Sequence, residues 1–219
     1  TGCKIAYSNV GGYIPGSEVF AIEEIKKADY VSVRDALSYE ENKKYCDSVY
    51  LAPDAAILMS DLFPRTRLYD EVSEKVKSID GKYIAIQFSL SYYRQHEDEI
   101  VKTLSDFSAE NKDVKFVLVP IGYAILHDDL VALRKLRENI PEAVLIENLT
   151  IKEIMYLISG AEFFAGTSLH GIVTAMSFAV PYISLGAHNS SAKLDCFVGT
   201  WGCKAYSKTM PVTELPILY

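Results

Sequence analysis

Lys115-Phe116-Val117-Leu118-Val119 is the stretch of sequence that decides the fold. Its last four residues are all apolar, so a strand formed by them has no polar side to turn toward water. Such a strand is typical of a parallel sheet that is covered on both faces. Segments with helical periodicity flank it at 97–110 and 129–139. We therefore predict a parallel β-strand at 115–119 with helices on both sides of its sheet.

The same alternation of strand and helix extends along most of the chain. Apolar runs predict further strands at 4–10, 30–34, 48–51, 83–88, 144–146, 162–165 and 182–185. Helices are predicted at 17–28 and 168–179 and near 189, and two capping boxes, Ser38 with Glu41 and Thr150 with Glu153, predict two helix starts. Residues 60–66, which contain Pro64, are predicted as a loop. Right-handed crossovers would make residues 81–206 an α/β, doubly wound, Rossmann-like parallel sheet.

The series of βα units is incomplete near the N-terminus. The first ~65 residues hold too few units to cover both faces of a parallel sheet. We interpret 1–66 as the closing portion of an N-terminal Rossmann-like domain, and 67–219 as a C-terminal Rossmann-like domain that binds the donor. In the alternative interpretation, the first segment adds strands to the second sheet.

Composition excludes several classes of protein. The net charge is −7 and the basic residues form no stripe, so we expect no nucleic-acid partner. No apolar run reaches the ~18 residues of a transmembrane helix. The cysteines form no CxxC pair, which argues against a metal site and is typical of thiols in a reducing, cytoplasmic compartment: Cys3, Cys46, Cys196 and Cys203. We expect no cofactor, and the sequence is compatible with a homo-oligomer.

The segment Gly166-Thr167-Ser168-Leu169-His170-Gly171 is the most informative of the predicted strand-end loops. Ligands of doubly wound sheets bind beyond the carboxyl ends of the strands. Thr167 or Ser168 can cap the following helix, which puts His170 in its first turn. A helix N-terminus attracts anions, so His170 is placed to contact one and to pass a proton. A neutral histidine that hydrogen-bonds a nearby loop is the alternative that its position leaves open.

This segment, continued by Pro181-Tyr182-Ile183-Ser184 and Lys193, resembles the hallmark segment of the polysaccharide pyruvyl transferase family. Two upstream blocks are also similar to that family, Asp29-Tyr30-Val31-Ser32-Val33-Arg34-Asp35 and Ala52-Pro53-Asp54. The resemblance implies a GT-B-like transferase of exopolysaccharide biosynthesis that moves pyruvyl from phosphoenolpyruvate to a saccharide. The chain departs from the family at Ser168, where many relatives carry an Arg that would contact the anion.

The resemblance also implies roles for individual residues. His170 would be the acid/base or phosphate contact. Arg34 would offer a fork for carboxylate or phosphate unless it forms a salt bridge with Asp35 or a neighbouring helix. The residues that it assigns to donor binding are Thr167, Ser168, Gly171, Lys193 and Arg94. For Lys193 a solvated surface lysine is the alternative. We expect His170 and Arg34 to approach one cleft, and the chain by itself to bind phosphate-bearing ligands weakly without turnover.

Two other functions remain open from the sequence. A GT-B glycosyltransferase would use a nucleotide-sugar donor, with Glu147 as the carboxylate for its ribose. A non-catalytic glycan-binding or scaffold domain would need neither a donor nor a carboxylate to bind one.

Overall fold

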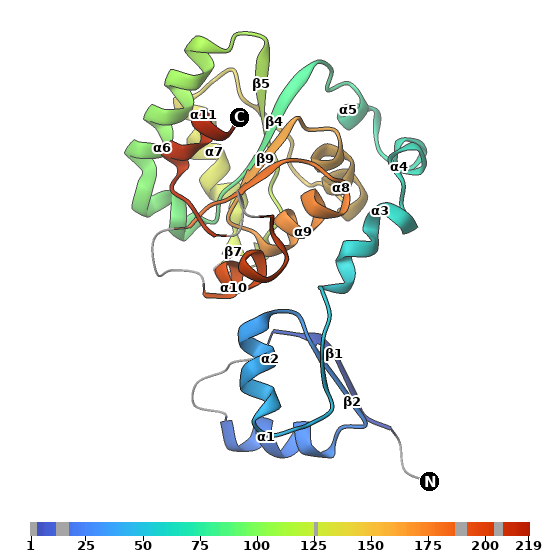
Figure 1. Ribbon diagram of the computed structural model, residues 1–219. Coiled ribbons are helices and arrows are strands. Elements are labelled where there is room, and N and C mark those ends of the chain that lie inside the picture. The colour runs from blue at the N-terminus through green and yellow to red at the C-terminus, as the bar shows by residue number, and fades with distance from the viewer. Residues whose placement is uncertain (1–3, 12–17, 125–126, 187–191, 204–207) are drawn as a thin grey trace. The chain divides into compact units, whose positions relative to one another are not determined.

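The computed structural model of the protein describes residues 4–11, 18–124, 127–186, 192–203 and 208–219 (Figure 1). The described residues fall into two compact units. Unit 1 lies within Thr1–Ala55 and Asp195–Lys208, and unit 2 within Ala56–Leu194 and Thr209–Tyr219. The domain assignment from the sequence, 1–66 and 67–219, stays a prediction.

Unit 1 is built on a three-stranded parallel sheet in the order β1-β2-β3. Buried valines at positions 31, 33 and 49 form its core. The strands lie close to the predicted ranges. The elements are β1 (Ala6–Val10), α1 (Glu18–Lys27), β2 (Tyr30–Val33), α2 (Ala36–Lys43) and β3 (Val49–Leu51).

The start of α2 differs from the prediction. Asp35 is the N-cap, and its Oδ1 accepts a hydrogen bond from the Ser38 backbone N–H at 2.8 Å. Ser38 is buried inside the helix, and Glu41 pairs with Lys44 at 2.6 Å instead of reaching back to Ser38. The capping box at Ser38 was therefore wrong. Aspartate caps as well as serine does, and Asp35 comes first after the strand.

Unit 2 contains a five-stranded sheet in the order β10-β9-β4-β5-β8, and every pair of neighbours is parallel. Taken in chain order, these strands follow the 3-2-1-4-5 arrangement of a doubly wound fold. The predicted Rossmann-like parallel sheet is thus confirmed. Its strands are β4 (Lys82–Gln87), β5 (Val114–Leu118), β8 (Val144–Leu145), β9 (Phe163–Gly166) and β10 (Tyr182–Ser184).

Helices cover both faces of this sheet, as predicted. On one face, Ile84 and Ile86 share a core with α6 (Leu90–Glu110) and α7 (Asp129–Asn139). Tyr83, which comes directly before Ile84, points to the other face, where its hydroxyl donates to the Leu157 carbonyl of α8 (Ile151–Ser159) at 2.7 Å. Helix α9 (Leu169–Ser177) contacts α8 on that side, and Figure 1 shows the two pairs of helices on opposite sides of the sheet.

Three helix boundaries bear on the site. The box of Thr150 and Glu153 caps α8 as predicted. Helix α6 begins seven residues earlier than predicted, after the N-cap Ser89, and has non-helical dihedrals at His96. Helix α10 is described over Ala192–Trp201, so its predicted start near residue 189 lies outside the described residues.

The segment 60–66 is helical except at Phe63 and Pro64, which corrects the predicted loop. It contains the end of α3 (Met59–Leu62) and the beginning of α4 (Arg65–Glu71), and Pro64 is the N-cap of the second helix. Proline has no N–H to contribute, but a helix start needs none, so Pro64 only divides the helices. Arg65 of α4 donates to the Tyr156 carbonyl of α8 at 2.6 Å, and this packing stabilises the helical turn.

The remaining elements are short. A two-stranded antiparallel ladder joins β6 and β7. The bounds are η1 (Ala55–Leu58), α3 (Met59–Leu62), α4 (Arg65–Glu71), α5 (Glu74–Lys77), β6 (Tyr123–Ala124), β7 (His127–Asp128), η3 (Val212–Glu214) and α11 (Leu215–Leu218).

Candidate functional site

The strand order of unit 2 reverses between β4 and β9, and this point carries the candidate site. The chain leaves β4 toward one face of the sheet and leaves β9 toward the other. The last residues of the two strands, Gln87 and Gly166, are register partners. Ligands of doubly wound folds bind in the crevice at such a switch point.

The loop after β9 forms a capped helix start. Ser168 is the N-cap of α9, and its Oγ accepts the Gly171 backbone N–H at 3.3 Å. Thr167 Oγ1 accepts the backbone N–H of Ser89, the cap of α6, at 2.9 Å. The starts of α6 and α9 therefore lie side by side at the switch point, and both present the positive ends of helix dipoles there.

His170 lies in the first turn of α9 and is exposed. Its backbone carbonyl accepts the Thr174 hydroxyl at 2.6 Å, a bond that stays within the helix. His170 therefore stands at the start of the helix, where the sequence predicted it. Its role as acid/base or phosphate contact stays a prediction.

Gln87 is a residue of this site that the sequence analysis did not assign. Its side chain is 2% exposed, and its Oε1 accepts the backbone N–H groups of Thr167 and Ser168 at 2.9 and 2.8 Å. One amide oxygen therefore holds both residues that lead into α9. The sequence did offer one sign of this role, because Gln87 is a polar residue at the end of an apolar run, just before a strand-end loop.

Gly171 is buried where α9 crosses β9. A Cβ at this position would lie 2.5 Å from Cζ of Phe164, closer than real side chains approach. The backbone N–H of Gly171 is taken up by the Ser168 cap. The geometry gives Gly171 a packing role, and its predicted contact with the donor stays a prediction.

Arg34 belongs to unit 1 and follows β2. Its Nη1 lies 3.2 Å from Oδ2 of Asp54, and each side chain is only 14% exposed. The expected alternative partner, Asp35, instead caps α2. The ion pair joins the second and third blocks of the sequence resemblance. Because Arg34 and His170 lie in different units, their approach to one cleft stays a prediction.

The loops around Arg34 are held by further contacts. A Cβ on Gly11 would lie 2.8 Å from the guanidinium, so the glycine lets the arginine pack against the backbone. Asn9 has φ of 54° and donates from Nδ2 to the Pro53 carbonyl at 2.8 Å. The Arg34 carbonyl accepts the Trp201 indole N–H at 2.7 Å. At the carboxyl edge of the unit 1 sheet, Arg34 is thus held in an ion pair, and hydrogen bonds hold the loops around it.

The two remaining cations are both exposed. Arg94 lies in the first part of α6, after the buried Tyr92 and Tyr93, and Lys193 is the second residue of α10. Their exposure is compatible with the predicted donor contacts and equally with solvated surface positions. The roles assigned to them stay predictions.

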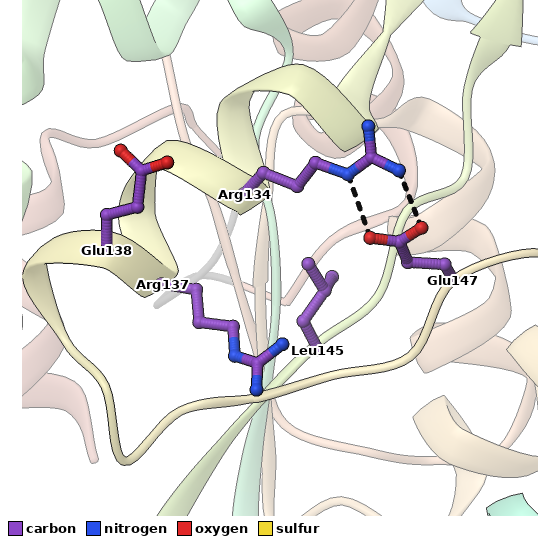
Figure 2. A pocket seen from close by; sticks show the side chains of 5 residues that line it. All are labelled: Arg134, Arg137, Glu138, Leu145 and Glu147. Atoms are coloured by element: carbon purple, nitrogen blue, oxygen red, sulfur yellow. Dashed lines mark hydrogen bonds and ion pairs between the residues drawn. The ribbon is translucent and has the colours of Figure 1, made fainter.

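Glu147 follows β8 and already has a cationic partner. Arg134 of α7 grips it with two hydrogen bonds, Nε to Oε1 at 2.8 Å and Nη2 to Oε2 at 2.6 Å (Figure 2). The Arg134 guanidinium lowers the pKa of this carboxyl. The pair borders a pocket of about 350 Å³ that Arg137, Glu138 and Leu145 also line. A ribose contact by Glu147 would have to compete with Arg134.

Solved structures with the same arrangement define the class of the fold. S. aureus MnaA in its UDP co-structure is 18% identical with a TM-score of 0.61, over 90% of this chain and 55% of that one. UDP-GlcNAc 2-epimerase from Neisseria meningitidis, bound to UDP-GlcNAc, is 14% identical with a TM-score of 0.60, over 83% and 53%. These likenesses show a GT-B-like α/β fold, and the chain spans about half the length of those proteins.

The profile of the polysaccharide pyruvyl transferase family matches residues 13–189, and the chain belongs to this family. The match includes both the Arg34 block and the Thr167–His170 segment. No curated protein matches the sequence. Among the described residues, no helix has the length and apolar character to cross a membrane.

Proposed function

We propose that this protein acts in the cytoplasm as a polysaccharide pyruvyl transferase, which moves the pyruvyl group of phosphoenolpyruvate onto a sugar of a surface polysaccharide. Family membership supports the reaction class. The observation that carries the proposal is the position of the Thr167–His170 segment. It begins α9 at the switch point of a doubly wound sheet, where such folds bind their ligands.

The reaction needs few protein groups. The donor methylene takes up one proton, and the adjacent carbon forms bonds to two sugar oxygens while its bond to the phosphate oxygen breaks. The two hydroxyls lose one proton each, so one proton goes to the methyl group and the other to phosphate. The site must therefore hold two anionic groups and pass protons near neutral pH.

The described residues can meet these demands in the following way. The start of α9 supplies a positive dipole end for the phosphate, and His170 passes the proton to or from the reacting groups. Arg34 is the second proposed anion contact, and a guanidinium keeps further N–H donors when Nη1 is on Asp54. Thr167, Ser168, Gly171, Arg94 and Lys193 complete the proposed donor site.

A nucleotide-sugar transferase is the second candidate function. Two of the similar structures were solved with UDP or UDP-GlcNAc bound, and the same switch point could accept a diphosphate. Against this function, Glu147 is bound by Arg134, so the proposed carboxylate for a ribose is occupied. A scaffold domain would bind neither donor.

His170→Gln is expected to weaken phosphoenolpyruvate binding by about 10- to 100-fold, because a hydrogen bond to a charged group contributes roughly 1.5–3 kcal/mol. Calorimetric titration of the wild type and the variant measures this, with UDP-GlcNAc as the competing ligand. His96→Gln in α6 is the matched control and should leave the affinity unchanged, since His96 faces Glu99 at 3.3 Å.

Three outcomes would contradict the proposal in different ways. Equal affinity of the wild type and His170→Gln would remove His170 from the site. Tighter binding of UDP-GlcNAc than of phosphoenolpyruvate would favour the nucleotide-sugar function. Binding of neither ligand would favour the scaffold.

A further inference from the structure

Asp129 is a buried acid behind the switch point. It is the first residue of α7 and is 3% exposed. Its Oδ2 accepts the backbone N–H groups of Ile121 and Gly122, at 3.1 and 2.7 Å, from the loop that follows β5. Burial raises the pKa of this carboxyl, and these hydrogen bonds oppose that effect. A buried carboxyl oxygen that accepts two backbone N–H groups in this way organises the loop around it.

Gln87 connects this acid to the candidate site. Its Nε2 donates to the same Oδ2 of Asp129 at 2.9 Å, while its Oε1 faces the loop after β9. An amide side chain can donate at one end and accept at the other in this way. We call Gln87 and Asp129 the relay, since together they join the loop after β5 to the loop after β9 across the end of β4. Both side chains are buried.

We propose that Gln87 and Asp129 are positioning residues, which hold the backbone of Thr167 and Ser168 in the geometry that the donor site requires. Neither side chain is proposed to contact the donor. They act through the two N–H groups bound by Gln87 and so fix the start of α9, which carries His170. This inference rests on the proposed function for its ligand but not for its geometry.

The direction of the hydrogen bond from Gln87 to Asp129 makes the inference testable. A glutamate at position 87 would place a carboxylate oxygen 2.9 Å from Asp129 Oδ2, where the amide nitrogen now lies. Two carboxylates so close raise each other's pKa until they share a proton. Asp128 is the other charged group that acts on Asp129. Gln87→Glu therefore breaks the relay near neutral pH and restores a donor at low pH.

The experiment compares Gln87→Glu with Gln87→Met, each divided by the wild type at the same pH. We expect both variants to bind phosphoenolpyruvate about tenfold more weakly near pH 7. Near pH 5 only Gln87→Glu should recover, to within about threefold of the wild type, because only it gains a proton for Asp129. The proposal is overturned if either variant binds like the wild type near pH 7, or if the ratio for Gln87→Glu does not change with pH.

A second readout separates this inference from the proposed function. The hydrogen-exchange protection of the Thr167 and Ser168 amides, in the free protein, should fall in Gln87→Glu near pH 7 and return near pH 5. If the wild type binds no phosphoenolpyruvate, the proposed function fails. The exchange protection of these two amides still tests the positioning role. Unchanged protection of both amides in Gln87→Glu would overturn the positioning role.

Asp129→Asn keeps the test informative if Gln87→Glu does not fold. Its amide oxygen can accept the same three donors, so binding should stay within about threefold of the wild type while Gln87→Met loses about tenfold. Weaker binding of phosphoenolpyruvate by Asp129→Asn than by Gln87→Met would contradict the proposal.

Discussion

Gly171→Val is expected to lower the free energy of unfolding by about 2–3 kcal/mol, because it overpacks a closed core. A Cβ at this position meets Cζ of Phe164 at 2.5 Å and Cδ1 of Ile121 at 3.0 Å. The Phe164 ring is 0% exposed and also closes the Cβ position of Gly166, at 2.7 Å. The ring has no free side to move into, so the strain exceeds the roughly 1 kcal/mol that replacing a helical glycine can return.

Urea denaturation of Gly171→Val, Phe164→Leu, the double variant and a control tests this expectation. Phe164→Leu removes the ring atoms that clash, so combined with Gly171→Val it should destabilise less than the sum of the single changes. Gly199→Val in α10 is the matched control, since this helical glycine is exposed and should tolerate a side chain. Additive effects of the two substitutions in unit 2 would show that Gly171 is not required by packing.

Glu153→Ala is expected to cost about 2–3 kcal/mol near neutral pH, because it removes a charged acceptor from several hydrogen bonds. Oε2 accepts the Thr150 backbone N–H at 2.8 Å and its hydroxyl at 2.9 Å, which caps α8. Oε1 accepts the hydroxyl of Ser73, the N-cap of α5, at 2.5 Å. One carboxylate therefore ties two helix starts together.

The contribution of Glu153 should depend on pH. Burial would raise the pKa of Glu153, but the hydrogen bonds from Ser73 and Thr150 outweigh it and hold the pKa below its ordinary value. A lowered pKa in the folded state stabilises the protein above the unfolded pKa of about 4.3, and this stabilisation is lost as pH falls through the folded value. The stability gap between the wild type and Glu153→Gln should thus narrow from pH 7 to pH 3. A constant gap would contradict the assignment.

Local patterns predicted the sheet of unit 2 well. An apolar run such as 115–119 needs only burial on both faces to become a central strand, and β5 is found there. The box of Thr150 and Glu153 also formed. At Ser38 the same pattern failed because Asp35, three residues earlier, caps the helix instead.

The site was predictable only in part, for a related reason. The position of His170 follows from a strand, a cap and a helix that are neighbours in sequence. The partners of Gln87, at positions 129 and 167, are brought to it by the strand order, which no local pattern states. Likewise Arg34 selects Asp54, which lies 20 residues away, over the adjacent Asp35.

The most direct test of the donor site is a phosphoenolpyruvate titration of the ¹⁵N-labelled protein, followed by amide NMR. Binding at the switch point should move the resonances of Ser89 and of residues 167–171, which lie at the starts of α6 and α9. The same titration of His170→Gln should shift them less at equal ligand concentration. Shifts confined to other parts of the protein, such as the surface around Arg134 and Arg137, or no shifts at millimolar ligand, would contradict the account.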